Sequence, residues 1–170
     1  MKKTEENKDW LKYENQAYDN GYEAVCGVDE AGRGPLAGPV FAAAVILPKG
    51  FIVEGANDSK KLSEKKREAL FEKIKEEAVS YSIAMVDERI IDEVNILNAT
   101  FMAMNDAINN LSQKPDFVMI DGNKIPPLDI DAECIVKGDA KSMSIACASI
   151  LAKVSRDRLL YKYAEEYPMY

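Results

Sequence analysis

A short apolar strand that ends in two adjacent acids constrains this chain more than any other stretch. Residues 25–28 are apolar, Asp29 and Glu30 follow them, and a second apolar run occupies residues 40–47. Neighbouring side chains of a strand point to opposite faces. Both acids can therefore reach one ion only if the strand ends there and the chain turns. The pattern predicts two adjacent strands with a pair of carboxylates at their tip.

The loop between these strands is rich in glycine and admits three interpretations. Gly32, Gly34 and Gly38 permit positive φ and close approach of a ligand to the main chain. The loop could be a hairpin with an exposed acidic tip. It could bind a dinucleotide, but the spacing misses G-x-G-x-x-G and no helix follows. We favour a metal site beside a loop that reads phosphate or sugar, with Arg33 as a fixed cation.

Further acids follow two later apolar runs. Residues 117–120 lead into Asp121 and a glycine, and a strand predicted at 134–136 leads into Lys137, Gly138 and Asp139. Together with the first pair, this suggests that adjacent strands deliver four carboxylates to one rim of a sheet. Clustered carboxylates repel one another unless cations lie between them. Two divalent ions held in this way can bracket the attacking and leaving oxygens of phosphodiester hydrolysis.

The absence of histidine narrows the chemistry. It excludes a Ser-His-Asp triad, a Cys-His pair and the H-E-x-x-H motif of zinc enzymes. The remaining metal ligands are oxygen atoms, which suit a hard cation such as Mg²⁺ or Mn²⁺. Three scattered cysteines fit neither disulfide pairing nor zinc spacing, and no signal peptide is visible, so we expect a cytoplasmic protein. The net charge of −7 argues against nucleic-acid binding, although bound cations would offset part of it.

The other segments predict a sheet with flanking helices. We expect five helices: at 9–20, after Ser63 as N-cap, after Asp87 as N-cap up to 94, from 98 onward, and from 140 to 166. We also expect a third strand at 79–86. Ser59 and Lys60 precede the second helix, where they could bind a phosphate or simply cap and charge the surface. Lys153 and Asp157 have the spacing of a helical ion pair, and contact of Lys153, Arg156 and Asp157 with the active site is the second possibility.

Residues 29–40, Asp-Glu-Ala-Gly-Arg-Gly-Pro-Leu-Ala-Gly-Pro-Val, resemble the signature of bacterial ribonuclease HII, a type 2 ribonuclease H. The resemblance returns at residues 121–123, 137–139, 148–154 and 156–157 and covers nearly the whole chain. It implies an α/β, ribonuclease H-like fold with a five-stranded mixed sheet flanked by helices, in the order βββαβαβα. It also implies one catalytic domain over residues 1–170, with an N-terminal helix within 1–20.

The resemblance assigns roles to individual residues. Asp29, Glu30, Asp121 and Asp139 match the catalytic, metal-binding acids of the family, which would hold two Mg²⁺ or Mn²⁺ ions. The substrate-binding residues that it implies are Gly32, Arg33 and Gly34, which match the loop that reads the 2′-hydroxyl, and Ser59 and Lys60. The implied reaction is an endonucleolytic cut 5′ to a ribonucleotide, in RNA–DNA hybrids or in duplex DNA with an embedded ribonucleotide.

The sequence departs from the family's pattern at the end of the chain. The family continues into a basic, histidine-containing segment with a Gly-Tyr pair, and this segment is missing after Tyr170. We therefore expect a truncated form that folds as a monomer without membrane contact, binds metal, has low affinity for substrate, and cleaves it weakly or not at all. Two other hypotheses stay open: another two-metal phosphodiesterase acting on DNA, and a non-catalytic core that binds Mg²⁺ or nucleic acid without turnover.

Overall fold

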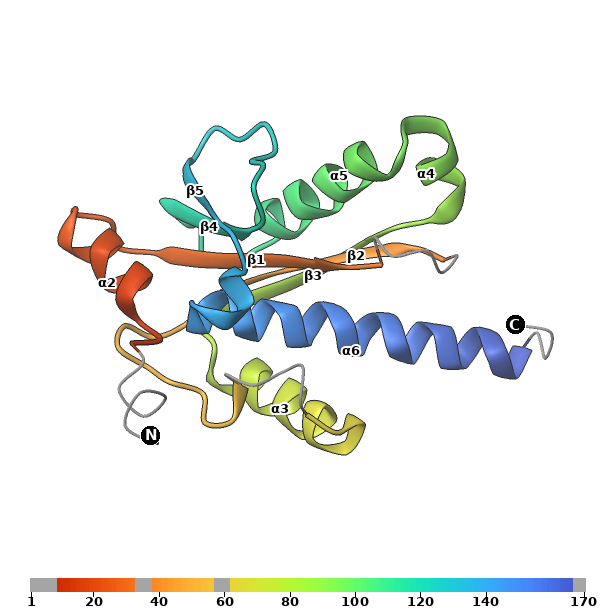
Figure 1. Ribbon diagram of the computed structural model, residues 1–170, viewed down its shortest axis with the longest axis horizontal. Helices are drawn as coiled ribbons and strands as arrows, with labels where there is room; N and C mark the ends of the chain where they lie inside the picture. Colours follow the sequence, from red (N-terminus) through yellow and green to blue (C-terminus); the bar gives the residue numbers. More distant parts are fainter. Residues whose placement is uncertain (1–8, 33–37, 57–61, 167–170) are drawn as a thin grey trace.

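The computed structural model describes residues 9–32, 38–56 and 62–166 (Figure 1). Helices and strands alternate irregularly along the chain, with one 3₁₀ turn, η2, before the last helix. Their bounds are α2 Lys12–Asp19, β1 Val25–Ala31, β2 Val40–Ile46, α3 Glu64–Glu77, β3 Ser80–Val86, α4 Glu88–Val94, α5 Ile96–Asn109, β4 Phe117–Asp121, β5 Asp131–Ile135, η2 Gly138–Ala140 and α6 Met143–Glu166.

The five strands form one mixed sheet in the order β3-β2-β1-β4-β5. The pairs β1–β2 and β2–β3 are antiparallel, whereas β1–β4 and β4–β5 are parallel. The central position of β1 explains its apolar composition, because a strand with neighbours on both sides and helices over both faces is buried. The predicted five-stranded mixed sheet flanked by helices is confirmed.

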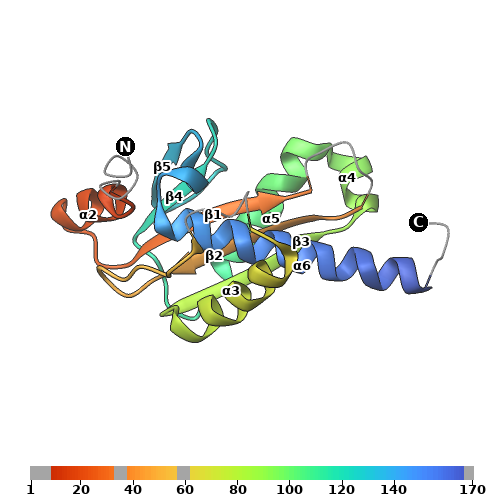
Figure 2. The same ribbon diagram turned by 60° about the horizontal axis from the view of Figure 1, so that its bottom comes forward.

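Helices cover the sheet on two sides. In Figure 1 the sheet is seen edge-on, with α4 and α5 on one face and α6 and α3 on the other. Figure 2 shows α6 lying along the sheet with α3 beside it. Alternate residues of β2 divide accordingly: Phe41, Ala43 and Val45 belong to the core under α6, and Ala42 and Ala44 to the core under α5. A side chain's place along its strand therefore decides which helical layer it meets.

Two of the predicted helix starts are confirmed. The Ser63 hydroxyl accepts from the backbone N–H of Lys66, and the Asp87 carboxylate accepts from the N–H groups of Arg89 and Ile90. The element order βββαβαβα is wrong, since α3 lies between β2 and β3 and no helix joins β4 to β5. The predicted 134–136 strand is also displaced: β5 begins three residues earlier and ends at Ile135.

The cysteines take no part in a disulfide within the described residues. Cys26 and Cys147 are buried and Cys134 is partly buried. Burial raises the pKa of the Cys26 thiol to about 12, so this group stays neutral and is a poor metal ligand. No described helix combines the length and the apolar character needed to cross a membrane.

Candidate metal centre

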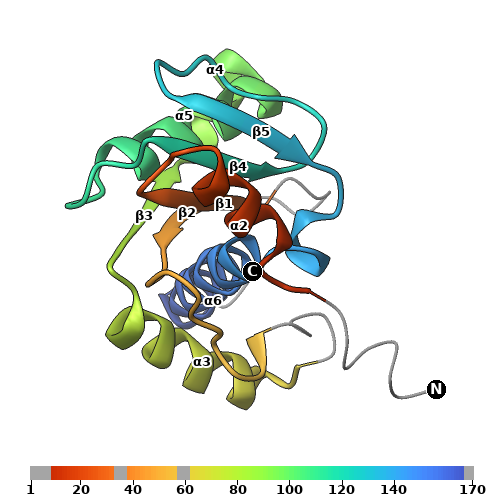
Figure 3. The same cartoon turned by 90° about the vertical axis from the view of Figure 1, so that its left-hand side faces the viewer.

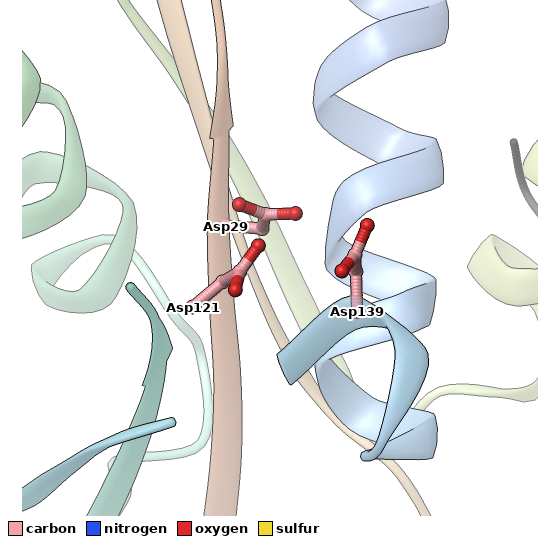
Figure 4. Close-up of side chains that lie close together, drawn as sticks. All are labelled: Asp29, Asp121 and Asp139. Carbon is pink, nitrogen blue, oxygen red and sulfur yellow. The ribbon is translucent and has the colours of Figure 1, made fainter. Parts of the chain in front are cut away.

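Three of the four predicted acids meet at one edge of the sheet. Asp29, Asp121 and Asp139 each offer a carboxylate oxygen, and these oxygens lie within 4.8 Å of one another. Figure 4 shows the three side chains pointing toward a common space, two from the sheet and the third from η2. Asp29 comes from β1 and Asp121 is the last residue of β4, the parallel neighbour of β1. An oxygen-only donor set of this kind suits a hard divalent cation.

The electrostatics of Asp29 favour a bound cation. Its side chain is only 5 % exposed, and one carboxylate oxygen accepts the backbone N–H of Glu30 at 2.8 Å. Burial raises the pKa of Asp29 well above its usual value, and the negative charge of Asp121 raises it further, with smaller contributions from Glu30 and Asp139. A cation among these acids would remove the repulsion and let Asp29 ionise. The residues present therefore fit a metal ion.

Glu30 is not part of this close group. β1 continues through both acids to Ala31, which pairs with Phe41, so the chain does not turn at residue 30 as the sequence suggested. Asp29 pairs with Ala43 on the α6 face, whereas Glu30 pairs with Ala42 on the α5 face. Its side chain therefore starts on the opposite face from Asp29.

Glu30 nevertheless lines two hollows, one of which it shares with Asp121. It contributes to a hollow of about 260 Å³ with Asp121, Gly122 and residues of α5, and also to a second hollow beside Gly32. Its pairing explains why three of the four expected carboxylates form the close group. Its function as a metal ligand stays a prediction.

Asp139 reaches the centre from a turn, not from a strand end. Lys137 adopts a left-handed conformation (φ 56°), and Asp139 lies in η2 immediately after it. The backbone N–H of Gly138 donates to the Asp121 carboxylate at 2.8 Å. This bond ties the turn to β4. The sequence correctly predicted that Asp139 would join Asp29 and Asp121, although by a different local structure.

The loop residue Gly32 has the expected backbone. Its φ is +106°, and a Cβ there would lie 2.6 Å from Arg156 Nε and 2.7 Å from the Pro39 carbonyl oxygen. Arg156 is buried and donates from Nε to that same carbonyl at 3.1 Å. Glycine is thus required both by the conformation and by the packed guanidinium. Four other predicted substrate-binding residues lie outside the described part of the chain: Arg33, Gly34, Ser59 and Lys60.

Two basic side chains of α6 share a hollow with Glu30. Lys153 and Arg156 line the hollow of about 370 Å³ that also contains Gly32 and Glu30. Lys153 forms the expected ion pair with Asp157, with nitrogen and oxygen 3.7 Å apart. The structural pairing is therefore confirmed, and contact of these side chains with the centre stays a prediction.

Two residues near the centre were missed in the sequence. Ser142 immediately precedes α6, where its hydroxyl accepts the backbone N–H of Ile145 and donates to the buried carboxylate of Glu14. A serine just before an apolar run is an N-cap signal and could have identified Ser142. No local pattern identifies Glu14, because its partner is 128 residues away.

Comparison with known proteins gives consistent matches. The family Ribonuclease HII matches residues 26–170. Ribonuclease HII of Caldicellulosiruptor bescii is 58% identical over 165 residues, which are 97% of this chain and 80% of that protein. Ribonuclease HII of Clostridioides difficile is 56% identical over 100% of this chain and 67% of its own. Among solved structures, ribonuclease H2 of Pyrococcus horikoshii OT3 aligns with a TM-score of 0.77 at 31% identity, covering 85% of this chain and 77% of that one.

Proposed function

The chain belongs to the ribonuclease HII family, which makes it a ribonuclease H, and on that premise we propose that it is a metal-dependent endonuclease. It hydrolyses the phosphodiester bond 5′ to a ribonucleotide, in RNA–DNA hybrids or in duplex DNA that contains a single ribonucleotide. The observation that carries this proposal is the group of three carboxylates within 4.8 Å of one another. Three ionised carboxylates this close repel one another unless cations lie between them. Divalent cations held by such a group can promote phosphodiester hydrolysis.

The acids are proposed as the ligands of two divalent ions, Mg²⁺ or Mn²⁺. Asp29, Asp121 and Asp139 provide the close group, and Glu30 is the proposed fourth carboxylate because it follows Asp29 in β1 and lines a hollow with Asp121. Divalent ions, when bound, supply Lewis acidity that activates water and stabilises charge on the departing oxygen. The protein holds two of the carboxylates by hydrogen bonds from the N–H groups of Glu30 and Gly138, at 2.8 Å each.

The hollow on the α6 side is the proposed place of the nucleic-acid backbone. Lys153 and Arg156 bring positive charge into the hollow that Glu30 also lines, which suits a phosphate group that approaches an otherwise acidic protein. Gly32 leaves main-chain atoms accessible beside it, and Arg33, Gly34, Ser59 and Lys60 are proposed as further substrate contacts. A 2′-hydroxyl both donates and accepts hydrogen bonds, so exposed main-chain groups are suitable readers of a ribose.

The test compares three labelled substrates of the same sequence: duplex DNA, an RNA–DNA hybrid and duplex DNA with one ribonucleotide. We expect cleavage of the last two in Mg²⁺, with the cut mapped 5′ to the ribonucleotide, and an intact all-DNA duplex. Equal cleavage of all three would instead identify a phosphodiesterase acting on DNA. Binding of the hybrid with no cleavage, even in Mn²⁺, would identify a non-catalytic core.

A further inference from the structure

A buried carboxylate from the N-terminal helix lies at the start of α6. Glu14 of α2 is 4 % exposed, and its Oε2 accepts from the Ser142 hydroxyl at 2.8 Å and from the backbone N–H of Ser144 at 2.9 Å. Its other oxygen, Oε1, is buried and has no hydrogen-bond partner within the described residues. Burying a carboxylate is costly unless its contacts are strong. Both hydrogen bonds of the Glu14 carboxylate go to residues at the start of α6, so they hold this part of the helix in place.

The contacts of Glu14 continue into the turn that carries Asp139. The Ser142 hydroxyl accepts the N–H of Ile145 at 3.2 Å, so Ser142 caps α6 while it donates to Glu14. The backbone N–H of Ser142 donates to the Gly138 carbonyl at 2.8 Å. Asp139 lies between these two residues in the chain. A shift of Ser142 would therefore move Asp139.

The start of α6 also lies directly against β1. A Cβ on Gly27 would be 2.3 Å from the Ser144 carbonyl carbon and 2.5 Å from the Ile145 nitrogen, so helix and strand meet backbone to backbone. Gly27 is two residues before Asp29 on the same strand. The first turn of α6 is thus the structural link between the strand that carries Asp29 and the turn that carries Asp139. Figure 3 shows the α2 segment and the start of β1 at the end of the molecule where α6 begins.

We propose that Glu14 is a positioning residue for the metal centre. By fixing the first turn of α6 through Ser142 and Ser144, it keeps the Asp139 carboxylate within ligating distance of Asp29 and Asp121. Glu14 does not belong to the group of close carboxylates, and its two hydrogen bonds go to Ser142 and Ser144. The inference rests on the proposed function in one respect, namely that the three acids bind divalent metal.

The test is direct titration with Mn²⁺, with the free ion followed by electron paramagnetic resonance at a temperature where circular dichroism shows every variant folded. Glu14→Ala should weaken Mn²⁺ binding about tenfold, the lower range for loss of a group that orients metal ligands. Glu14→Gln should recover most of this affinity, because its amide oxygen can accept both bonds. Cleavage by Glu14→Ala should recover as the metal concentration is raised.

Asp116→Ala is the matched control. The Asp116 carboxylate also accepts two backbone N–H groups, from Glu23 at 2.9 Å and Ala24 at 2.8 Å, but it does so at the opposite end of β1. This variant should lose stability and keep the parent's affinity for Mn²⁺. If Asp116→Ala loses as much affinity for Mn²⁺ as Glu14→Ala does, general destabilisation explains the loss, and the positioning role is overturned.

The remaining outcomes separate the inference from the proposed function. No Mn²⁺ binding by the parent would overturn the metal centre itself, whatever the variants do. Parent binding with unchanged affinity in Glu14→Ala would overturn only the positioning role. If Glu14→Ala does not fold, Ser142→Ala decides: it keeps the bond from Ser144 to Glu14 and the backbone bond to Gly138, and removes the hydroxyl that joins Glu14 to the residue following the Asp139 turn. Unchanged affinity in this variant would overturn the proposal, and a loss of affinity would support it.

Discussion

Replacing Asp29 with asparagine should stabilise the metal-free protein at neutral pH. Asparagine keeps the amide oxygen that can accept the Glu30 N–H and removes a buried negative charge. At 4.8 Å, the upper limit of spacing in the acid group, two unit charges repel by about 3.5 kcal/mol at an effective dielectric constant of about 20. Protonation of the parent's carboxyls relieves part of this repulsion, so we expect a gain of about 1–3 kcal/mol in the free energy of unfolding.

The pH dependence gives the sign of this effect. The pKa of Asp29 is raised in the folded state, by burial first and by Asp121 next. A carboxyl with a raised folded pKa contributes stability that is complete below its unfolded pKa, about 3.9, and is lost as pH rises through the folded value. The advantage of Asp29→Asn should therefore be small near about pH 4 and grow toward about pH 8.

Urea unfolding in EDTA at these two pH values measures the difference. Asp106→Asn is the control, since Asp106 is exposed on α5 and its change should stay within about 0.5 kcal/mol at both pH values. Saturating Mg²⁺ should remove most or all of the advantage of Asp29→Asn, because a ligand at 100 times its Kd stabilises the parent by about 2.7 kcal/mol. If Asp29→Asn is less stable than the parent in EDTA near neutral pH, the reasoning about repulsion among these acids is refuted.

Three further substitutions test the parts of the fold that support the centre. Gly27→Ala should cost about 3 kcal/mol or prevent folding, because backbone atoms of α6 occupy the Cβ position; a denaturation midpoint equal to the parent's would disprove that contact. Gly32→Ala should displace Arg156 and slow cleavage by up to about 100-fold while Mn²⁺ binding in a titration persists; unchanged cleavage would contradict it. Ser63→Ala should cost about 1 kcal/mol through loss of the α3 N-cap, with no change in metal affinity.

The sequence was sufficient where the signal is local. The apolar run at 117–120 leads into Asp121 and then a glycine, and the acid is indeed the last residue of β4. Glu30 shows the limit of such reasoning. Where β1 ends depends on its pairing with β2, which extends to Ala31 and Phe41, and that pairing sets the face of each acid. A one-residue difference in the end of a strand changes the face on which the next side chain lies.

The support of Asp139 depends on contacts that no window of the sequence contains. A left-handed Lys137 brings the chain from β5 into η2, a conformation that is uncommon for residues other than glycine. The first turn of α6 is then held by Glu14, far away in the chain. The sequence could predict that Asp29, Asp121 and Asp139 would gather, because the apolar runs before them are recognisable, although it placed Glu30 with them as well. It could not predict the contacts that hold the third acid in place.

The most direct test of the account is the rate of cleavage of duplex DNA with one ribonucleotide, measured against Mg²⁺ concentration for the parent and for Asp121→Asn. The amide oxygen of asparagine can still accept the N–H of Gly138, so the variant should remain folded. We predict no cleavage in EDTA, cleavage by the parent that rises with Mg²⁺, and a rate at least about 100-fold lower for Asp121→Asn, since loss of groups that merely orient ligands already costs about 10–100-fold. Cleavage by the parent in EDTA, or an equal rate for Asp121→Asn, would contradict a metal-dependent centre built on these carboxylates.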